Sequence, residues 1–145
     1  MPTTFTYRTI VEFADTDLAG IMHFSNFFRF MERAEHAFWR SLGLSVHMEI
    51  EGRTVSWPRV QATCDYRLPL KFEDEIEVDV SIREVRARAL VFGFVFRKAG
   101  IADLAAEGSV TAVCASHDAA SGRMRAIEIP SVIKEKLAMT HPATS

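Results

Sequence analysis

Cysteine is scarce in this sequence, and its few glycines are never clustered. The 2 cysteines, Cys64 and Cys114, lie far apart in apolar stretches typical of strands. Such spacing argues against a disulfide framework, and we interpret both as buried free thiols of a reducing compartment. The 7 glycines stand singly along the chain, which excludes a glycine-rich phosphate-binding loop.

Neither sign of charge is in clear excess, because 17 Lys and Arg against 19 Asp and Glu give a formal net charge of -2. Nucleic-acid binding depends on neutralising phosphates with basic residues, so we expect no nucleic-acid partner. The longest apolar run, residues 89–96, is far shorter than the ~20 residues of a membrane-spanning helix. The N-terminus also lacks a basic region followed by an apolar core. We therefore expect no membrane partner and a cytoplasmic location.

The size and composition are those of a folded globular protein. The 145 residues match one ordinary domain, and 48% of them are apolar and 25% charged. No internal repeat, linker or low-complexity segment interrupts the chain. We expect a single domain over residues 1–145, with the polar tail at 141–145 frayed.

The N-terminal third predicts one strand followed by one long helix. Apolar and polar side chains alternate over residues 5–13, and this period of two indicates a strand. Apolar side chains then recur at spacings of three and four over residues 25–42, the stripe of an amphipathic helix. Ser25 is a candidate N-cap and Gly43 a candidate C′ residue. The apolar arc is wide, so we expect other structure to wrap the helix.

The rest of the chain predicts antiparallel strands and a short final helix. The strands are expected at about 54–67, 75–87, 89–99 and 101–117, and the helix at about 130–139. One strand, one wrapped helix and a run of strands form an α+β order, which excludes a Rossmann-type nucleotide site. We predict a curved antiparallel sheet folded around the central helix.

Two carboxylates, Asp15 and Asp17, lie in the turn that joins the first strand to the helix. The turn leads into a helix N-terminus, where free backbone N–H groups and about half a positive charge can polarise a carbonyl oxygen. A carboxylate beside such a site could act on that carbonyl. Asp also often only shapes a turn by bonding to the backbone, and the residues alone leave both interpretations open.

This stretch resembles the 4-hydroxybenzoyl-CoA thioesterase family, which includes the thioesterases associated with the Tol-Pal system. The resemblance rests on Asp15-x-Asp17-x-x-Gly20, on the aromatic-rich segment that follows up to Asn26, and on Glu32 in the helix. Further matches extend it over nearly the whole chain: Tyr66, Pro69, Phe72, Asp74 and residues 123–130.

The resemblance implies a hot-dog fold and an acyl-CoA thioesterase, which hydrolyses the thioester of an acyl- or aroyl-CoA. It assigns catalysis to Asp17, as nucleophile or general base, and implies that the backbone N–H of Phe24 polarises the thioester oxygen. A thiol leaves as thiolate without a strong acid, so one carboxylate and an oxyanion site can suffice. We expect neither metal nor cofactor, and the acyl group, aromatic or aliphatic, is left open.

For several polar residues the sequence leaves two interpretations of their role open. His23 could act as a base, but the family more often has Tyr or Trp at this place, so it could instead shape the acyl pocket. Asn26 could order the loop or contact the substrate. Glu35 falls on the apolar arc, where a carboxylate needs a partner, and a residue across a subunit interface is one candidate. Glu32 and His36 have i,i+4 spacing but lack the further ligands of a metal site.

Further substrate contacts are implied by the resemblance. Trp57, Pro58 and Arg59 match the strand start that is expected to contact the acyl group from the neighbouring subunit, although a packed Trp at a strand edge is an equal alternative. Arg86 and Arg88 lie near the basic turn that in related enzymes meets the nucleotide phosphates of CoA. Arginines on strands are also often only a solvated face.

A single sheet of this kind leaves an exposed edge strand, which pairing with a second copy would satisfy. We expect at least a homodimer, with a dimer of dimers as the larger assembly and the active site between subunits. Two rival functions stay open. A dehydratase of the same fold would show a His paired with an acidic residue, and a non-catalytic acyl-CoA or partner-binding module would not need Asp17.

Overall fold

An antiparallel sheet of five strands is the main element of the computed structural model, which describes residues 5–140. All neighbouring strands pair antiparallel. In spatial order they are β1 (Phe5–Ile10), β5 (Glu75–Val85), β6 (Ala89–Lys98), β7 (Ala106–Val113) and β4 (Arg59–Tyr66). The edges of the sheet are therefore β1 and β4. The tail expected to fray, 141–145, lies outside the described residues.

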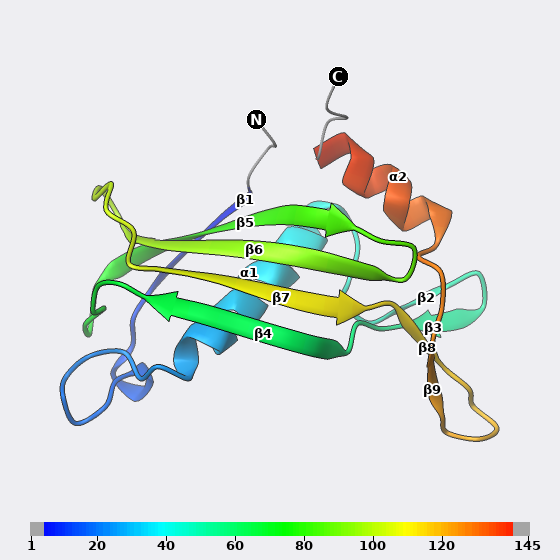
Figure 1. The fold of residues 1–145 in the computed structure, drawn as a ribbon, viewed down its shortest axis with the longest axis horizontal. Helices are drawn as coiled ribbons and strands as arrows, with labels where there is room; N and C mark the ends of the chain where they lie inside the picture. The colour runs from blue at the N-terminus through cyan, green and yellow to red at the C-terminus, as the bar shows by residue number, and fades with distance from the viewer. Residues whose placement is uncertain (1–4, 141–145) are drawn as a thin grey trace.

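The sheet curves around the helix α1 (Asn26–Ser41), which crosses one of its faces (Figure 1). This is the predicted hot-dog arrangement. Gly43 ends the helix as predicted: its φ of 74° lets Gly43 and the next residue donate backbone hydrogen bonds to carbonyls of the last turn. Ser25 is the N-cap residue as predicted, but its hydroxyl bonds to His23 and makes no capping hydrogen bond to the helix.

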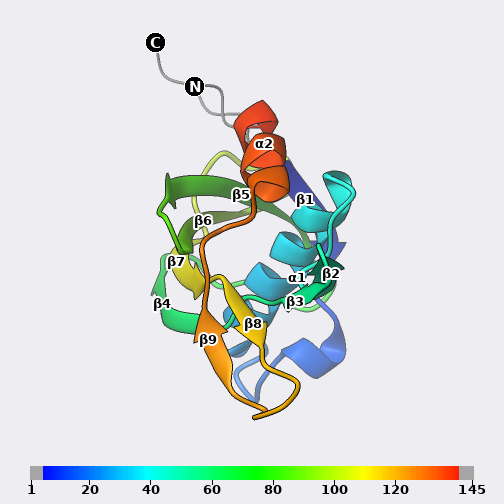
Figure 2. The ribbon, with the colours of Figure 1, turned by 90° about the vertical axis from the view of Figure 1, so that its right-hand side faces the viewer.

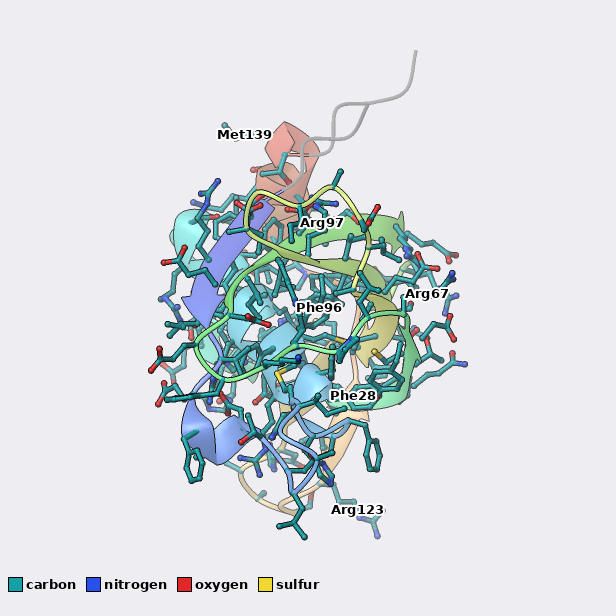
Figure 3. The ribbon with its side chains drawn as sticks, turned by 90° about the vertical axis from the view of Figure 1, so that its left-hand side faces the viewer. Phe28, Arg67, Phe96, Arg97, Arg123 and Met139 are labelled. Atoms are coloured by element: carbon teal, nitrogen blue, oxygen red, sulfur yellow. The ribbon has the colours of Figure 1, made fainter. Side chains whose placement is uncertain are left out.

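Side-chain size on the inward face of the sheet determines how closely α1 can approach. This face carries large residues on β6 and small ones on β7: Leu90, Phe92, Phe94 and Phe96 against Ala106, Gly108, Val110 and Ala112. Near the end of β6, Phe96 lies between sheet and helix, with its ring 5.1 Å from that of Phe27 of α1 (Figure 3). Met31 of α1 lies over Gly108, where an added Cβ atom would clash with its Cε. Glycine therefore allows the helix to pack closely on β7.

Two predicted strands are divided in the structure. The stretch at 54–67 breaks at Trp57-Pro58, because proline has no N–H for a ladder. Before the break lies β3 (Arg53–Val55), which forms a hairpin with β2 (Met48–Ile50). The stretch at 101–117 becomes regular only at Ala106. It then divides into β7 and β8 (Ala115–His117), which pairs with β9 (Met124–Ala126).

The predicted C-terminal helix is present as α2 (Ser131–Thr140). It lies at the end of α1 away from the β8–β9 hairpin (Figure 2). Lys136 Nζ donates to the carbonyl oxygen of Leu42 at 3.0 Å, so an ammonium meets the negative end of the α1 dipole. No helix in residues 5–140 is both long and apolar enough to span a membrane.

We expect Gly108→Ala to destabilise the fold by about 1–3 kcal/mol, the usual cost of overpacking a core. The new methyl group would meet Met31 and would lie 2.6 Å from the backbone oxygen of Thr63. Urea unfolding measures the change. Ser109→Ala is the matched control, because that side chain is half-buried on the other face of β7. Equal stability losses in the two variants would contradict the proposed close packing.

Candidate active site

Asp17 stands in a tight loop between β1 and α1. The first strand ends at Ile10, earlier than predicted, and a 3-10 turn, η1 (Phe13–Asp15), follows it. The loop then closes on itself through two backbone hydrogen bonds of 2.9 Å, from Asp17 N–H to the carbonyl of Ile21 and from Gly20 N–H to the carbonyl of Asp17. Gly20 has a φ of 81°, a conformation that glycine adopts without strain.

The carboxylate of Asp17 is half-buried and is only partly engaged by this turn. Its Oδ1 accepts the backbone N–H of Ala19 at 2.8 Å, which is the turn-shaping role considered above. Within residues 5–140, no protein group donates to Oδ2. One oxygen therefore orders the loop while the other remains available for chemistry.

Asp15 is by contrast a structural residue that is 9% exposed. Its Oδ2 accepts the backbone N–H of Glu12 at 2.9 Å. Its backbone carbonyl accepts both the N–H of His23 and Nδ2 of Asn26, each at 2.9 Å. The side-chain amide of Asn26 is thus engaged in ordering the loop, which favours that interpretation over contact with substrate.

A cavity of about 440 Å³ opens beside Asp17. Its walls come from the Asp17 loop, the start of α1 and the chain at the end of β4, and include Asp17, Met22, Phe24, Phe27, Tyr66 and Leu70. The walls are bonded to one another, because the N–H of Met22 donates to the carbonyl of Leu70 at 2.6 Å. The lining is mainly apolar and has two charged residues, Asp17 and Arg67, which suits an apolar group carrying a reactive carbonyl.

Phe24 lies just before α1 and lines the same cavity. Its backbone N–H has no acceptor among residues 5–140, whereas the N–H of Asn26 donates to the carbonyl of His23 at 2.9 Å. The first turn of α1 contains no acidic residue, so nothing in it offsets the positive end of the helix dipole. A free N–H at this position can polarise a carbonyl oxygen.

His23 lies next to the cavity but is not part of its lining. Its Nδ1 is 2.8 Å from Ser25 Oγ, and its ring stacks on that of Phe24 with centroids 4.7 Å apart. No carboxylate bonds to the ring in the described part of the chain. These contacts favour support of the loop, and a direct role of His23 in catalysis stays a prediction.

Glu35 is 1% exposed, and its partners lie in the same chain. Oε1 accepts Nη2 of Arg59 at 2.6 Å and Oε2 accepts Nε1 of Trp39 at 3.0 Å. Both oxygens of Glu35 are therefore satisfied without a residue from across a subunit interface. Burial raises the pKa of Glu35, and the guanidinium of Arg59 and the indole N–H of Trp39 offset this only in part.

Trp57 and Arg59 belong to the same cluster. The indole of Trp57 is 4% exposed and stacks on Trp39 with centroids 5.4 Å apart, so the packed alternative holds for this side chain. Arg59 also donates to the carbonyl of Trp57 at 2.6 Å. Pro58 and Arg59 are half-buried at the start of the edge strand β4, and their contact with an acyl group stays a prediction.

Arg86 and Arg88 lie in the turn between β5 and β6, at the opposite end of the sheet from Asp17 (Figure 1). Both are exposed, and Arg86 pairs with Glu84 at 3.0 Å. One chain therefore does not bring them to the cavity. Their role in binding CoA would require a second chain and stays a prediction.

Two sets of residues were missed in the sequence. Tyr66 served only as a mark of resemblance, yet it lines the Asp17 cavity from the end of β4. A polar hollow between the hairpins β2–β3 and β8–β9 brings Arg53 beside Arg123 and Arg125, which lie 70 or more positions later in the sequence and so could not be grouped with it from sequence alone. Among residues 5–140, no cluster of His, Cys, Asp and Glu could hold a metal ion.

Comparison with known proteins decides the family. The family model of the thioesterase-like superfamily matches residues 11–137, which include the Asp17 loop and β4. The chain belongs to this superfamily. The predicted resemblance to 4-hydroxybenzoyl-CoA thioesterases is thereby confirmed.

Individual members of the thioesterase-like superfamily match over most of the chain. A 1,4-dihydroxy-2-naphthoyl-CoA hydrolase from Synechocystis sp. is 30% identical over 77% of this chain and 80% of its own length. A 4-hydroxybenzoyl-CoA thioesterase from Pseudomonas sp. is 26% identical over 90% of this chain and 95% of its own length. The solved structure of the gentisyl-coenzyme A thioesterase BH1999 is 30% identical, with a TM-score of 0.79 over 92% of this chain and 100% of that one.

The raised pKa of Glu35 predicts a pH dependence that Glu35→Gln should remove. Above the ordinary pKa of about 4.5, an unfolded chain releases this proton while the folded chain still holds it, so the folded state loses stability as pH rises through that window. Glutamine resembles the protonated form and does not titrate. Urea unfolding between pH 4 and pH 7 gives the free energy of unfolding of both proteins. We expect the value of the wild type, minus that of the variant, to fall as pH rises. A rise would contradict the assignment.

Proposed function

We propose that this chain hydrolyses CoA thioesters of aromatic acids and that Asp17 is the residue acting on the thioester carbonyl. One observation carries the proposal: the partly free carboxylate of Asp17 and the unbonded N–H of Phe24 belong to residues that line one cavity at the N-terminal end of α1. In the net reaction, water supplies the hydroxyl of the product acid, the carbon–sulfur bond breaks and CoA leaves with a free thiol.

The two groups divide the chemistry between them. The N–H of Phe24 donates to the thioester oxygen and stabilises the negative charge that develops on it. Asp17 either attacks the acyl carbon, giving a mixed anhydride that water then cleaves, or takes a proton from the attacking water. In both schemes the sulfur leaves as thiolate, since a thiol has a pKa of about 8.5. Neither scheme calls for a metal or a cofactor.

Aromatic acyl groups suit the walls of this cavity. The rings of Phe24, Phe27 and Tyr66 line it, and its volume of about 440 Å³ lies within the roughly 300–1,000 Å³ of small-molecule sites. Rings stack or meet edge to face with such walls. The three relatives compared above carry dihydroxynaphthoyl, hydroxybenzoyl and gentisyl groups in their names, which supports the same class for this chain.

A second copy would complete the site through β4. This strand is an edge with unpaired backbone groups, and Val60 on it is 64% exposed. If two copies pair antiparallel along β4, the two-fold axis brings the Arg59 end of one strand beside the Tyr66 end of the other. Pro58 and Arg59 of one subunit would then border the Asp17 cavity of the other. Such dimers could stack into a dimer of dimers, which this site does not require.

The same pairing would provide a phosphate site for CoA. The basic end of one chain, with Arg86, Arg88 and the hollow around Arg123, would then lie toward the cavity of the other chain. Arginine binds phosphate in a bidentate manner, and CoA carries several phosphate oxygens. We also propose a cytoplasmic location, which the free thiols Cys64 and Cys114 support.

Asp17→Asn should lower hydrolysis by at least about 10²-fold, because an amide neither attacks a thioester nor accepts a proton at neutral pH. The assay measures thiol release from benzoyl-, 4-hydroxybenzoyl-, hexanoyl- and palmitoyl-CoA. We expect the aroyl substrates to give the highest kcat/KM. Asp103→Asn, at an exposed loop residue, is the matched control and should leave activity unchanged.

The outcomes separate the rival functions. Hydrolysis that survives Asp17→Asn would refute the proposed mechanism. Binding of acyl-CoA by the wild type without turnover would favour a non-catalytic module. Hydration or dehydration of an unsaturated acyl-CoA would favour a dehydratase, although His23 has the hydroxyl of Ser25 and no carboxylate as its partner in the described chain.

Ala62→Asp should weaken the dimer and reduce hydrolysis together. Ala62 is exposed near the middle of β4, so two-fold pairing would bring two new carboxylates close to each other. Sedimentation velocity should show a dimeric wild type and a shift of the variant toward monomer. Ala102→Asp, in the exposed loop after β6, is the control. A fully active wild-type monomer would contradict the proposed shared site.

A further inference from the structure

We infer that Tyr66 is a positioning residue for the backbone N–H of Phe24: its hydroxyl holds the peptide that follows Phe24 and, together with the hydrogen bond from Asn26 to the carbonyl of His23, orients the donor that meets the thioester oxygen. This inference rests on the proposed thioesterase function. It adds to the site a side chain from the sheet, outside the loop that carries Asp17.

The contact is direct and joins distant parts of the chain. The hydroxyl of Tyr66 donates to the backbone carbonyl of Phe24 at 2.9 Å, across a sequence separation of 42 residues. Tyr66 is the last residue of β4, and Phe24 precedes α1 by two positions. In the described range, no other side-chain hydrogen bond ties residues 23–25 to the sheet.

Two peptide planes flank the α-carbon of Phe24, and hydrogen bonds hold both of them. In a trans peptide the C=O and N–H point in opposite directions. The carbonyl of His23 accepts the N–H of Asn26 at 2.9 Å, which fixes the plane that carries the N–H of Phe24. The next plane is held at two atoms: the carbonyl of Phe24 accepts the hydroxyl of Tyr66, and the N–H of Ser25 donates to Nδ1 of His23 at 3.3 Å. Both dihedral angles of Phe24 are thus constrained.

Tyr66 is itself well held for this role. Its backbone pairs with Ala106 of β7, and its ring meets that of Phe27 edge to face with centroids 4.9 Å apart. Desolvation of the hydroxyl raises the pKa of Tyr66 to about 12. The phenol therefore keeps its proton at neutral pH and remains a donor.

The role of the hydroxyl can be separated from packing. Tyr66 is 43% exposed, and replacement by Phe keeps the ring that contacts Phe27 while removing only the donor. A structural effect would appear as a lower melting temperature. An effect on the N–H of Phe24 would appear in kcat, because that N–H bonds most strongly to the oxygen in the transition state.

The test compares Tyr66→Phe with Tyr7→Phe, since the chain contains 2 tyrosines and Tyr7 lies on β1. With an aroyl-CoA, we expect Tyr66→Phe to lower kcat about threefold to tenfold, the range for one neutral hydrogen bond, at unchanged KM and melting temperature. This is less than the roughly 10²–10³-fold that follows loss of such a donor itself. Tyr7→Phe should behave as wild type.

A second measurement does not depend on turnover. Amide hydrogen exchange followed by NMR should be faster in Tyr66→Phe at Ser25 and Asn26, whose N–H groups bond to His23, and unchanged at Asp17. Wild-type hydrolysis with an unchanged kcat in Tyr66→Phe would overturn this inference and leave the proposed function intact. A change in KM alone would also overturn it, because it would make Tyr66 a wall of the pocket. No hydrolysis by the wild type would instead overturn the proposed function.

Discussion

The buried Asp15 is the residue on which the shape of the loop at the candidate active site depends. Its backbone carbonyl accepts hydrogen bonds from His23 and Asn26, and its carboxylate accepts the N–H of Glu12. These bonds fold the loop back onto the start of α1, so that Asp17 and Phe24 face one cavity. Ordering such a loop costs about 1–2 kcal/mol of backbone entropy per residue, which these local bonds help to offset.

The edge strand β4 is attached to the rest of the molecule at both ends by polar contacts. At its start, Arg59 pairs with the buried Glu35 of α1, and at its end, Tyr66 bonds to Phe24. A buried ion pair contributes little net stability because both charges lose their water. Its geometry is specific, however, and here it sets the position of the strand along the helix. The register of β4 and the conformation at Phe24 are therefore linked through one rigid strand.

Local patterns in the sequence predicted most of the elements, whereas contacts between distant residues stayed hidden. The apolar stripe of α1 and the glycine that ends the helix, Gly43, depend on residues only a few positions apart, so the sequence alone predicts them. The role of Asp17 came from family resemblance, because a carboxylate in a turn has a common structural use. The partner of Glu35 could not be found from sequence, since Arg59 meets it only after the sheet closes on the helix. Pro58 was visible, yet its interruption of the strand was not predicted.

The walls of the cavity come from two separate parts of the chain, residues 17–27 and 66–70. The second part is held in place by β4, whose only pairing strand among residues 5–140 is β7, which ends at Val113. Strands that are far apart in sequence pair late in folding, because the long chain segment between them must be ordered before their contacts form. A growing chain on the ribosome therefore cannot assemble this centre until most of the polypeptide has been synthesised, and the emerging protein stays inert toward cellular thioesters until its sheet is complete.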